Sequence, residues 1–330
     1  MNLTVDLWDV GQGDCSVITL PDGRLFIIDV GPERSQLPDW LELGRHRSTK
    51  IYAIAITHND EDHAGCIEHL LERWAAHRRI ENVFVLQDRK PDQKTKRLLK
   101  AIIRYHEKGW LTMHRLEARK PVAPLYGFDG TDKLTMYAVY PEVAHAMNAV
   151  LRNAPKSNLA SGIICLDING QSQIIWPGDA PMQTISRFCS KRKPILIVGP
   201  HHGAPVKRDQ KSYAPAFDNP DPQNVFISVG TTNIYQHPVP DFIKKHCEKG
   251  RTVFCSQLVH CDRLAVEKQR HVMNQHLRLE LLPPHDQGAV TCRGPVRMSW
   301  NSSNGTFEFD GFHQEHRNKV KGLHDALCEY

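Results

Sequence analysis

The sequence predicts a mixed α/β fold of the α+β kind, in which two β-sheets pack face to face and helices cover the outer faces. We expect a four-layer αββα sandwich, and the prediction rests on two observations. Strand-like apolar segments followed by amphipathic helices occur in two successive sets along the 330 residues. In addition, short segments rich in histidine and aspartate follow several of these strands, where such sheets carry their sites.

The first set of strands begins at the N-terminus. Residues 3–10 alternate between apolar and polar side chains, Gly11-Gln12-Gly13 interrupts the alternation, and residues 15–20 resume it. Pro21-Asp22-Gly23 is a turn sequence, and the apolar residues 25–30 follow it. Period-two alternation bounded by glycine and proline is typical of hairpins, so these ranges are predicted as a hairpin and a further strand.

The next segments combine strands with helices. Residues 51–56 and 83–86 are short apolar runs that we interpret as buried strands. A helix is predicted after His63, because its apolar residues recur at the spacing i, i+3, i+4, i+7; they are Ile67, Leu70, Leu71 and Trp74. A second helix is predicted over residues 94–106.

The strand pattern starts again in the second half of the chain. Residues 163–168 and 173–176 flank Asn169-Gly170, a strong hairpin signal. Residues 195–198 and 224–229 are two further short apolar strands. The residues from 301 to 330 are polar, and we expect a C-terminal extension there, either packed on the core or a tail.

Composition narrows the class of protein. Hydrophobic residues make up 40% and charged residues 24% of the chain, which is ordinary for a soluble globular protein. No apolar run approaches the roughly 20 residues that cross a bilayer, and the N-terminus lacks the pattern of a secretory signal. We therefore expect a cytoplasmic protein that does not bind membranes.

The charge of the chain bears on its partners, and its cysteines bear on the redox state of its thiols. The net charge of +5 permits an anionic partner such as DNA, RNA or a nucleotide, and basic residues crowd between Arg73 and Lys120. The nine cysteines are scattered, which favours reduced thiols. Cys255, Cys261 and Cys292 could form a small structural zinc site beside His260, with ordinary buried thiols as the alternative. Whether the chain pairs with itself or with a partner protein is left open.

The segment Thr57 to His63, Thr-His-Asn-Asp-Glu-Asp-His, carries the clearest chemical signal. It places four metal-ligand side chains within six residues, directly after a buried strand; they are His58, Asp60, Asp62 and His63. A ligand-rich turn after a rigid strand is a common way to hold divalent cations in fixed geometry. The alternative is a solvated acidic loop that caps the following helix.

Three later segments repeat this arrangement. Asp179 follows a strand on a glycine turn, His201 and His202 follow the next strand, and His237 comes a few residues after Val229. Each segment alone is weak. Together they predict that histidine and aspartate side chains from several strand ends converge on one site.

In these segments the chain resembles the metallo-β-lactamase-fold hydrolases, in particular the group related to the DNA-internalisation competence protein ComEC. The resemblance spans roughly residues 1–300, which we therefore predict as one hydrolase domain. The matching pieces, in order, are Asp9–Asp14, Ile27–Gly31, Thr57–Gly65, Ser157-Asn158, Pro177–Asp179, Pro200–Gly203 and Ser228–Gly230 with His237-Pro238.

The resemblance implies a role for each residue. His58 and Asp60 would bind one metal ion, Asp62 and His63 a second, and Asp179 would bridge the two. His237, with His202 as a further candidate, would complete the ligands. Alternatively, His201 and His202 could contact a phosphate or protonate a leaving group, and they are candidate catalytic residues together with Asp62. Asp14, Asp29 and Asn158 would orient the ligands, with a role in capping turns as the alternative for Asp14 and Asp29.

The resemblance also implies a mechanism. Two divalent cations would hold a bridging hydroxide that attacks the substrate, so no serine or cysteine nucleophile is needed. The oxygen donor Asp60 shifts the preference from Zn²⁺ toward Mn²⁺ or Mg²⁺, and a single occupied site is the alternative. A phosphodiesterase or nuclease fits best. The alternatives are a hydrolase of a small ester, lactone or thioester, and a sensing subunit that lacks turnover.

Overall fold

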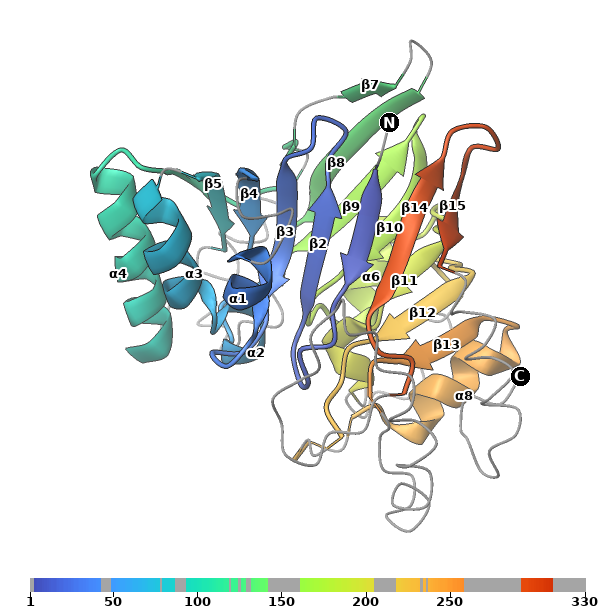
Figure 1. The fold of residues 1–330 in the computed structure, drawn as a ribbon. Coiled ribbons are helices and arrows are strands. Elements are labelled where there is room, and N and C mark those ends of the chain that lie inside the picture. Colours follow the sequence, from blue (N-terminus) through green and yellow to red (C-terminus); the bar gives the residue numbers. More distant parts are fainter. Residues whose placement is uncertain are drawn as a thin grey trace.

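The computed structural model describes most of the chain. It covers residues 3–42, 49–77, 79–86, 93–118, 120–123, 126–128, 132–141, 161–204, 218–231, 234–235, 237–257 and 292–310. Two sheets pack face to face, and helices lie on their outer faces, as Figure 1 shows. This is the metallo-β-lactamase sandwich arrangement, and the predicted fold class is confirmed.

The first sheet contains eight strands in the described residues, in the order β15-β14-β1-β2-β3-β4-β5-β6. Pairing is parallel from β3 to β6 and antiparallel elsewhere. The strands are β1 (Thr4–Leu7), β2 (Cys15–Thr19), β3 (Leu25–Val30), β4 (Ile51–Ala55), β5 (Ile80–Val85), β6 (Thr112–Arg115), β14 (Val296–Asn301) and β15 (Thr306–Phe309).

The second sheet has the order β13-β12-β11-β10-β9-β8-β7. Pairing is parallel from β10 to β13 and antiparallel from β7 to β10. The strands are β7 (Tyr126–Phe128), β8 (Asp132–Tyr140), β9 (Ile163–Ile168), β10 (Gln171–Trp176), β11 (Leu196–Val198), β12 (Asn224–Ile227) and β13 (Thr252–Cys255).

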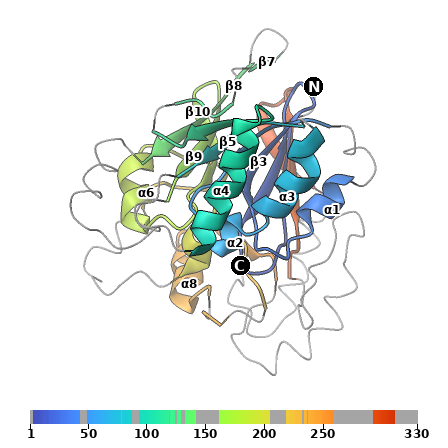
Figure 2. The same cartoon turned by 90° about the vertical axis from the view of Figure 1, so that its left-hand side faces the viewer.

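Helices cover the outer face of each sheet. On the first sheet lie α1 (Leu37–Glu42), α2 (Glu61–Ala64), α3 (Ile67–Trp74) and α4 (Gln93–Glu107), and Figure 2 shows α3 and α4 in front of it. On the second sheet lie α6 (Met182–Cys189) and α8 (Pro240–Glu248). None of the helices in the described residues is long and apolar enough to cross a membrane.

Three clusters of buried side chains hold these layers together. In β3, Phe26 and Ile28 join the cluster between the two sheets, while Leu25 and Ile27 join the cluster under the helices of the first sheet. A third cluster lies between the second sheet and the helices α6 and α8. Because successive strand residues point to opposite faces, one apolar run fills two cores at once.

The predicted and observed elements differ mainly at their ends. The helix predicted over 94–106 spans Gln93–Glu107, and the strand predicted over 51–56 spans Ile51–Ala55. The expected domain limit at residue 300 falls within β14, which pairs with β1 on one side and with β15 on the other. Residues 311–330, the rest of the predicted extension, lie outside the described residues.

Candidate metal centre

The metal-ligand segments meet because they leave parallel strands at the same edge of the sandwich. His58 comes after β4, Asp179 after β10, and His201 and His202 after β11. Backbone hydrogen bonds connect the loops directly: Gly162 donates to the Thr57 carbonyl at 2.6 Å, and His201 donates to the Gly178 carbonyl at 3.0 Å. The sandwich therefore brings residues from both sheets to one site.

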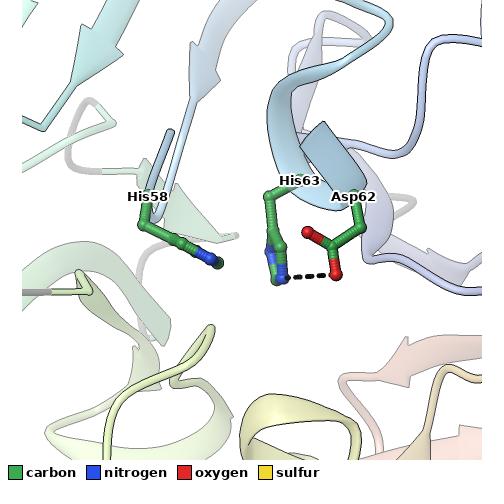
Figure 3. Close-up of side chains that lie close together, drawn as sticks. All are labelled: His58, Asp62 and His63. Carbon is green, nitrogen blue, oxygen red and sulfur yellow. Dashed lines mark ion pairs between the residues drawn. The ribbon is translucent and has the colours of Figure 1, made fainter. Parts of the chain in front are cut away.

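The short helix α2 sets the direction of the first ligands. Asp60 precedes it in an extended conformation, and the backbone amides of His63 and Ala64 donate to the Asp60 carbonyl at 3.1 and 2.9 Å. The His63 ring lies between the His58 ring and the Asp62 carboxylate, as Figure 3 shows. His58 and His63 are fully buried, and their ring centroids lie 4.0 Å apart.

Asp179 lies between two groups of histidines. Its Oδ2 atom is 3.4 Å from His58 Nε2 and 3.3 Å from His201 Nε2. Its Oδ1 atom is 3.1 Å from His63 Nε2 and 4.0 Å from His202 Nε2. Each carboxylate oxygen thus faces its own pair of imidazoles, which is the arrangement that a carboxylate bridging two cations requires.

Two further carboxylates complete these groups. Asp60 Oδ2 lies 3.6 Å from His58 Nε2, on the Oδ2 side of Asp179. Asp62 Oδ2 lies 3.1 Å from His202 Nε2 and 3.9 Å from His63 Nε2. Among the described residues, ligand atoms within 4.8 Å of one another include the sets His58-Asp60-Asp179 and His63-Asp179-His202.

The imidazoles are held in place through their other ring nitrogens. His63 Nδ1 lies 2.9 Å from Asp29 Oδ2, and Asp29 also accepts hydrogen bonds from the Thr57 amide and hydroxyl, each at 2.7 Å. His202 Nδ1 lies 2.8 Å from the Ser228 carbonyl oxygen, and Asp14 Oδ1 is 3.7 Å away. Partners of this kind fix the ring orientation, so that Nε2 faces the centre.

Burial and charge shift the pKa values of these groups strongly. Burial lowers the pKa of His202, but Asp14 and Asp62 outweigh it and raise the pKa to about 9. For Asp179 the directions are reversed: burial raises the pKa of its carboxyl, yet His58 and His63 hold that pKa well below its usual value. Excess carboxylate charge is thus balanced by protons on histidines, and cations that bind there must displace those protons.

The donor set fits divalent cations. His58 Nε2 and His63 Nε2 are buried, and neither has a hydrogen bond of normal geometry within the described residues, although Asp179 is close to both. Buried polar nitrogens are costly without a partner, and a cation between ring and carboxylate would satisfy both. The mixture of imidazole nitrogens with carboxylate oxygens suits Zn²⁺ or Mn²⁺.

His201 and His237 lie toward the outer side of the centre. The His201 side chain is 42% exposed, and burial, the largest cause, lowers its pKa. The His237 ring centroid lies 5.5 Å from that of His201. Backbone φ angles of 48° at His201 and 51° at His202 turn these adjacent side chains to different sides of Asp179. In this arrangement it is His202, more than His237, that faces Asp62.

Several residues that the sequence did not single out support the centre. The Ser161 hydroxyl accepts a hydrogen bond from the Asp179 amide at 3.0 Å and lies 3.3 Å from the Pro177 carbonyl. A Cβ at Gly178, where φ is +50°, would meet the Ser161 and Thr57 oxygens at 2.5 Å. Thr57 was visible as the first residue of the ligand segment, whereas Ser161 has no signal in the sequence.

Two other predictions remain untested. Asn158 and Cys261 lie outside the described residues. Cys255 and Cys292 are buried and lie on neighbouring backbone segments, since the Arg293 amide donates to the Cys255 carbonyl at 3.0 Å. The proposed zinc site therefore stays a prediction.

The comparisons with known proteins agree with this geometry. Residues 8–127, which are less than half of the chain, match the family model of the metallo-beta-lactamase superfamily. That superfamily consists mostly of hydrolytic metalloenzymes. The match includes the ligands from His58 to His63 and ends before Asp179. The search of curated proteins found no significant match.

Three solved structures illustrate the similarity. Igni18, a metallo hydrolase from the hyperthermophilic archaeon Ignicoccus hospitalis, is 17% identical with a TM-score of 0.45, over 76% of this chain and 94% of that one. Zn²⁺-bound PqqB from Methylobacterium extorquens is 9% identical with a TM-score of 0.40, over 73% and 85%. A long-form RNase Z from yeast is 11% identical with a TM-score of 0.42, over 94% and 49%. None of these similarities transfers an activity to this chain.

Proposed function

We propose that this protein is a metal-dependent phosphodiesterase, with nuclease activity on DNA or RNA as its simplest form, and that it belongs to the ComEC-like group. One observation carries the proposal: the two oxygens of Asp179 face two separate sets of ligands, on opposite sides of one buried carboxylate. When bound, two divalent cations would activate water and neutralise charge on the phosphate oxygens.

The protein's own residues prepare the site for this chemistry. Asp29 and the Ser228 carbonyl keep the rings of His63 and His202 turned toward the centre. The lowered pKa of His201 keeps its ring neutral near pH 7, which favours a role as metal ligand over a role as proton donor. Asp60 and Asp62 add hard oxygen donors, which favour Mn²⁺ over Zn²⁺.

The basic segment contributes less to substrate attraction than its sequence indicates. In α4, Arg97 pairs with Glu33 and Glu68, and Lys94 pairs with Glu61. These pairs offset part of the positive charge of α4. We therefore infer that the phosphodiester is held mainly by the metal centre, and that no broad cationic surface on α4 is needed.

The proposal is tested with the full chain, stripped of metal and reloaded with Mn²⁺ or Zn²⁺. Substrates are a single-stranded DNA oligonucleotide, bis(p-nitrophenyl) phosphate, p-nitrophenyl acetate, a lactone and a thioester. We expect hydrolysis of the phosphodiesters, abolished in Asp62→Ala and retained in Glu61→Gln, an exposed acid next to it in sequence. Hydrolysis of the acyl substrates alone would replace the proposal with the acyl hydrolase alternative. Metal binding without hydrolysis of any of them would favour the sensing role.

A further inference from the structure

An exposed aromatic segment lies beside the metal centre. Three large hydrophobic side chains are exposed in the described part of the chain, and two of them are neighbours: Ile234 is 85% and Tyr235 is 63% exposed. The third, Ile103, is 38% exposed on α4. Single exposed apolar residues are ordinary, but an adjacent pair at the edge of a candidate active site is a feature that a ligand would cover.

The Tyr235 ring is connected to the centre through a series of stacked and edge-on rings. It stacks on His237, with centroids 5.9 Å apart and an interplanar angle of 17°. His237 in turn packs edge-on against His201 at 5.5 Å, and His201 Nε2 lies 3.3 Å from Asp179. Tyr235 is 63% exposed although its ring stacks on His237, so the residue remains accessible to a ligand.

This segment is anchored at both ends, and the second anchor is the loop that carries His201 and His202. The Thr231 amide donates to Gln257 Oε1 at 2.8 Å, and the Val239 amide donates to the Gly203 carbonyl at 3.0 Å, directly after His202. A Cβ at Gly203 would meet Pro238 at 2.6 Å, so the two segments are closely packed. The rings are thus placed by the same loop that carries two candidate ligands, which makes the platform preorganised.

We propose that Tyr235, supported by His237, is a stacking platform for a nucleobase, and that the substrate is therefore a nucleotide phosphodiester. This inference rests on the proposed phosphodiesterase function. A nucleotide carries a flat base one sugar away from its phosphate, so a phosphate at the metal centre places a base at the adjoining edge. Every base has an aromatic face, so stacking gives affinity without sequence preference.

The test separates the base from the backbone. Oligothymidylate of six residues is compared with an oligomer of the same length and backbone in which abasic residues replace the nucleotides. We expect Tyr235→Ala to raise the KM for oligothymidylate about 5- to 150-fold with kcat little changed, because stacking of one base contributes that factor to binding. The KM for the abasic oligomer should not change, and Tyr235→Phe should behave like the parent protein.

Binding is measured separately from turnover, by calorimetric titration of both oligomers into the metal-free protein in EDTA. The dissociation constants should follow the same order as the KM values. Ile103→Ala, which removes an exposed apolar side chain far from this segment, is the matched control and should bind oligothymidylate like the parent. If a dinucleotide binds as tightly as the hexamer, the ligands of the platform are small nucleotides. If the hexamer binds much more tightly, the ligands are nucleic acid strands.

The two proposals fail in different ways. If phosphodiesters are cleaved but Tyr235→Ala has the same KM and dissociation constant as the parent for both oligomers, the platform is refuted and the proposed function stands. If oligothymidylate binds through Tyr235 but no phosphodiester is cleaved, the proposed function fails and the platform stands. Equal loss of affinity for both oligomers in Tyr235→Ala would also overturn the platform, because it would show a general effect on the site.

Discussion

At the scale of single residues, the position of the two carboxylate oxygens of Asp179 distinguishes a shared centre from two separate sites. His58 and His201 face one oxygen, while His63 and His202 face the other. Because the side chain is only 4% exposed, water cannot replace a missing partner easily. The whole arrangement therefore depends on one residue that belongs to the second sheet.

We expect Asp179→Asn to lose both cations, because it removes the charge that both would share. Asp60→Asn should keep about one cation per chain, since Asp60 lies in the ligand set His58-Asp60-Asp179 and the set His63-Asp179-His202 remains intact. Metal content after equilibrium dialysis, measured by mass spectrometry, checks this difference. Phosphodiester hydrolysis should fall at least about 100-fold in Asp179→Asn. Retention of two cations by Asp179→Asn would contradict the bridging role.

The residues of this centre show what the sequence could and could not predict. The spacing within Thr57–His63 was sufficient to identify four candidate ligands, because they are neighbours after one strand. The sequence could not predict that His201 and His202 face different oxygens of Asp179, since this depends on two left-handed backbone conformations in succession. Such conformations are uncommon for residues other than glycine, and here they directly precede Gly203, whose φ is also positive.

At the scale of elements, the strands and helices that the sequence predicts were found within a few residues, but other elements were missed. They include the internal strand β8, the strands β6, β13, β14 and β15, and the helices α6 and α8. Strand β6 consists of Thr-Met-His-Arg and is only partly buried, so it carries no apolar run. The hairpin β14–β15 forms because β1 offers it an edge almost 300 residues away in sequence. Local patterns cannot report pairing of this kind.

The helix α8 carries a buried histidine that makes stability depend on pH. Burial, together with the charges of Arg251 and Lys249, lowers the pKa of His246 to about 3. The folded state keeps this ring neutral, while the unfolded chain binds a proton below about pH 6.5. The contribution of the neutral His246 ring to the free energy of unfolding is therefore complete above pH 6.5 and is lost as the pH falls toward 3.

We expect His246→Gln to flatten the decline of unfolding free energy between pH 6 and pH 4, by up to about 1.4 kcal/mol per pH unit. Urea unfolding at several pH values measures this slope. The replacement of His69, which is exposed on α3, by glutamine is the control and should leave the slope unchanged. An unchanged slope in His246→Gln would show that the buried ring is protonated in the folded protein.

At the scale of the whole molecule, the candidate centre joins the two halves of the sandwich. His58, Asp62 and His63 come from the first sheet, whereas Asp179 and His202 come from the second. Cations bound between them would act as cross-links across the interface, in addition to the apolar cluster that the sheets share. Folding stability and metal occupancy are therefore linked.

This linkage gives a measurable consequence. At a free metal concentration of about 100 times the dissociation constant, each bound cation should add about 2.7 kcal/mol to the unfolding free energy. We expect EDTA to lower the melting temperature of the parent by several degrees. The melting temperature of Asp179→Asn should respond far less. A parent protein that melts at the same temperature with and without EDTA would exclude the cross-link.

The pairing of β1 with β14 has a consequence for how the chain is made. During synthesis on the ribosome, β1 emerges almost 300 residues before its partner β14, which begins at Val296. Until then the nascent first half exposes an open strand edge and an uncovered apolar face, both of which favour association with other chains. The first sheet is therefore complete only after the hairpin β14–β15 has been made. A chain that ends before this hairpin would be prone to aggregate.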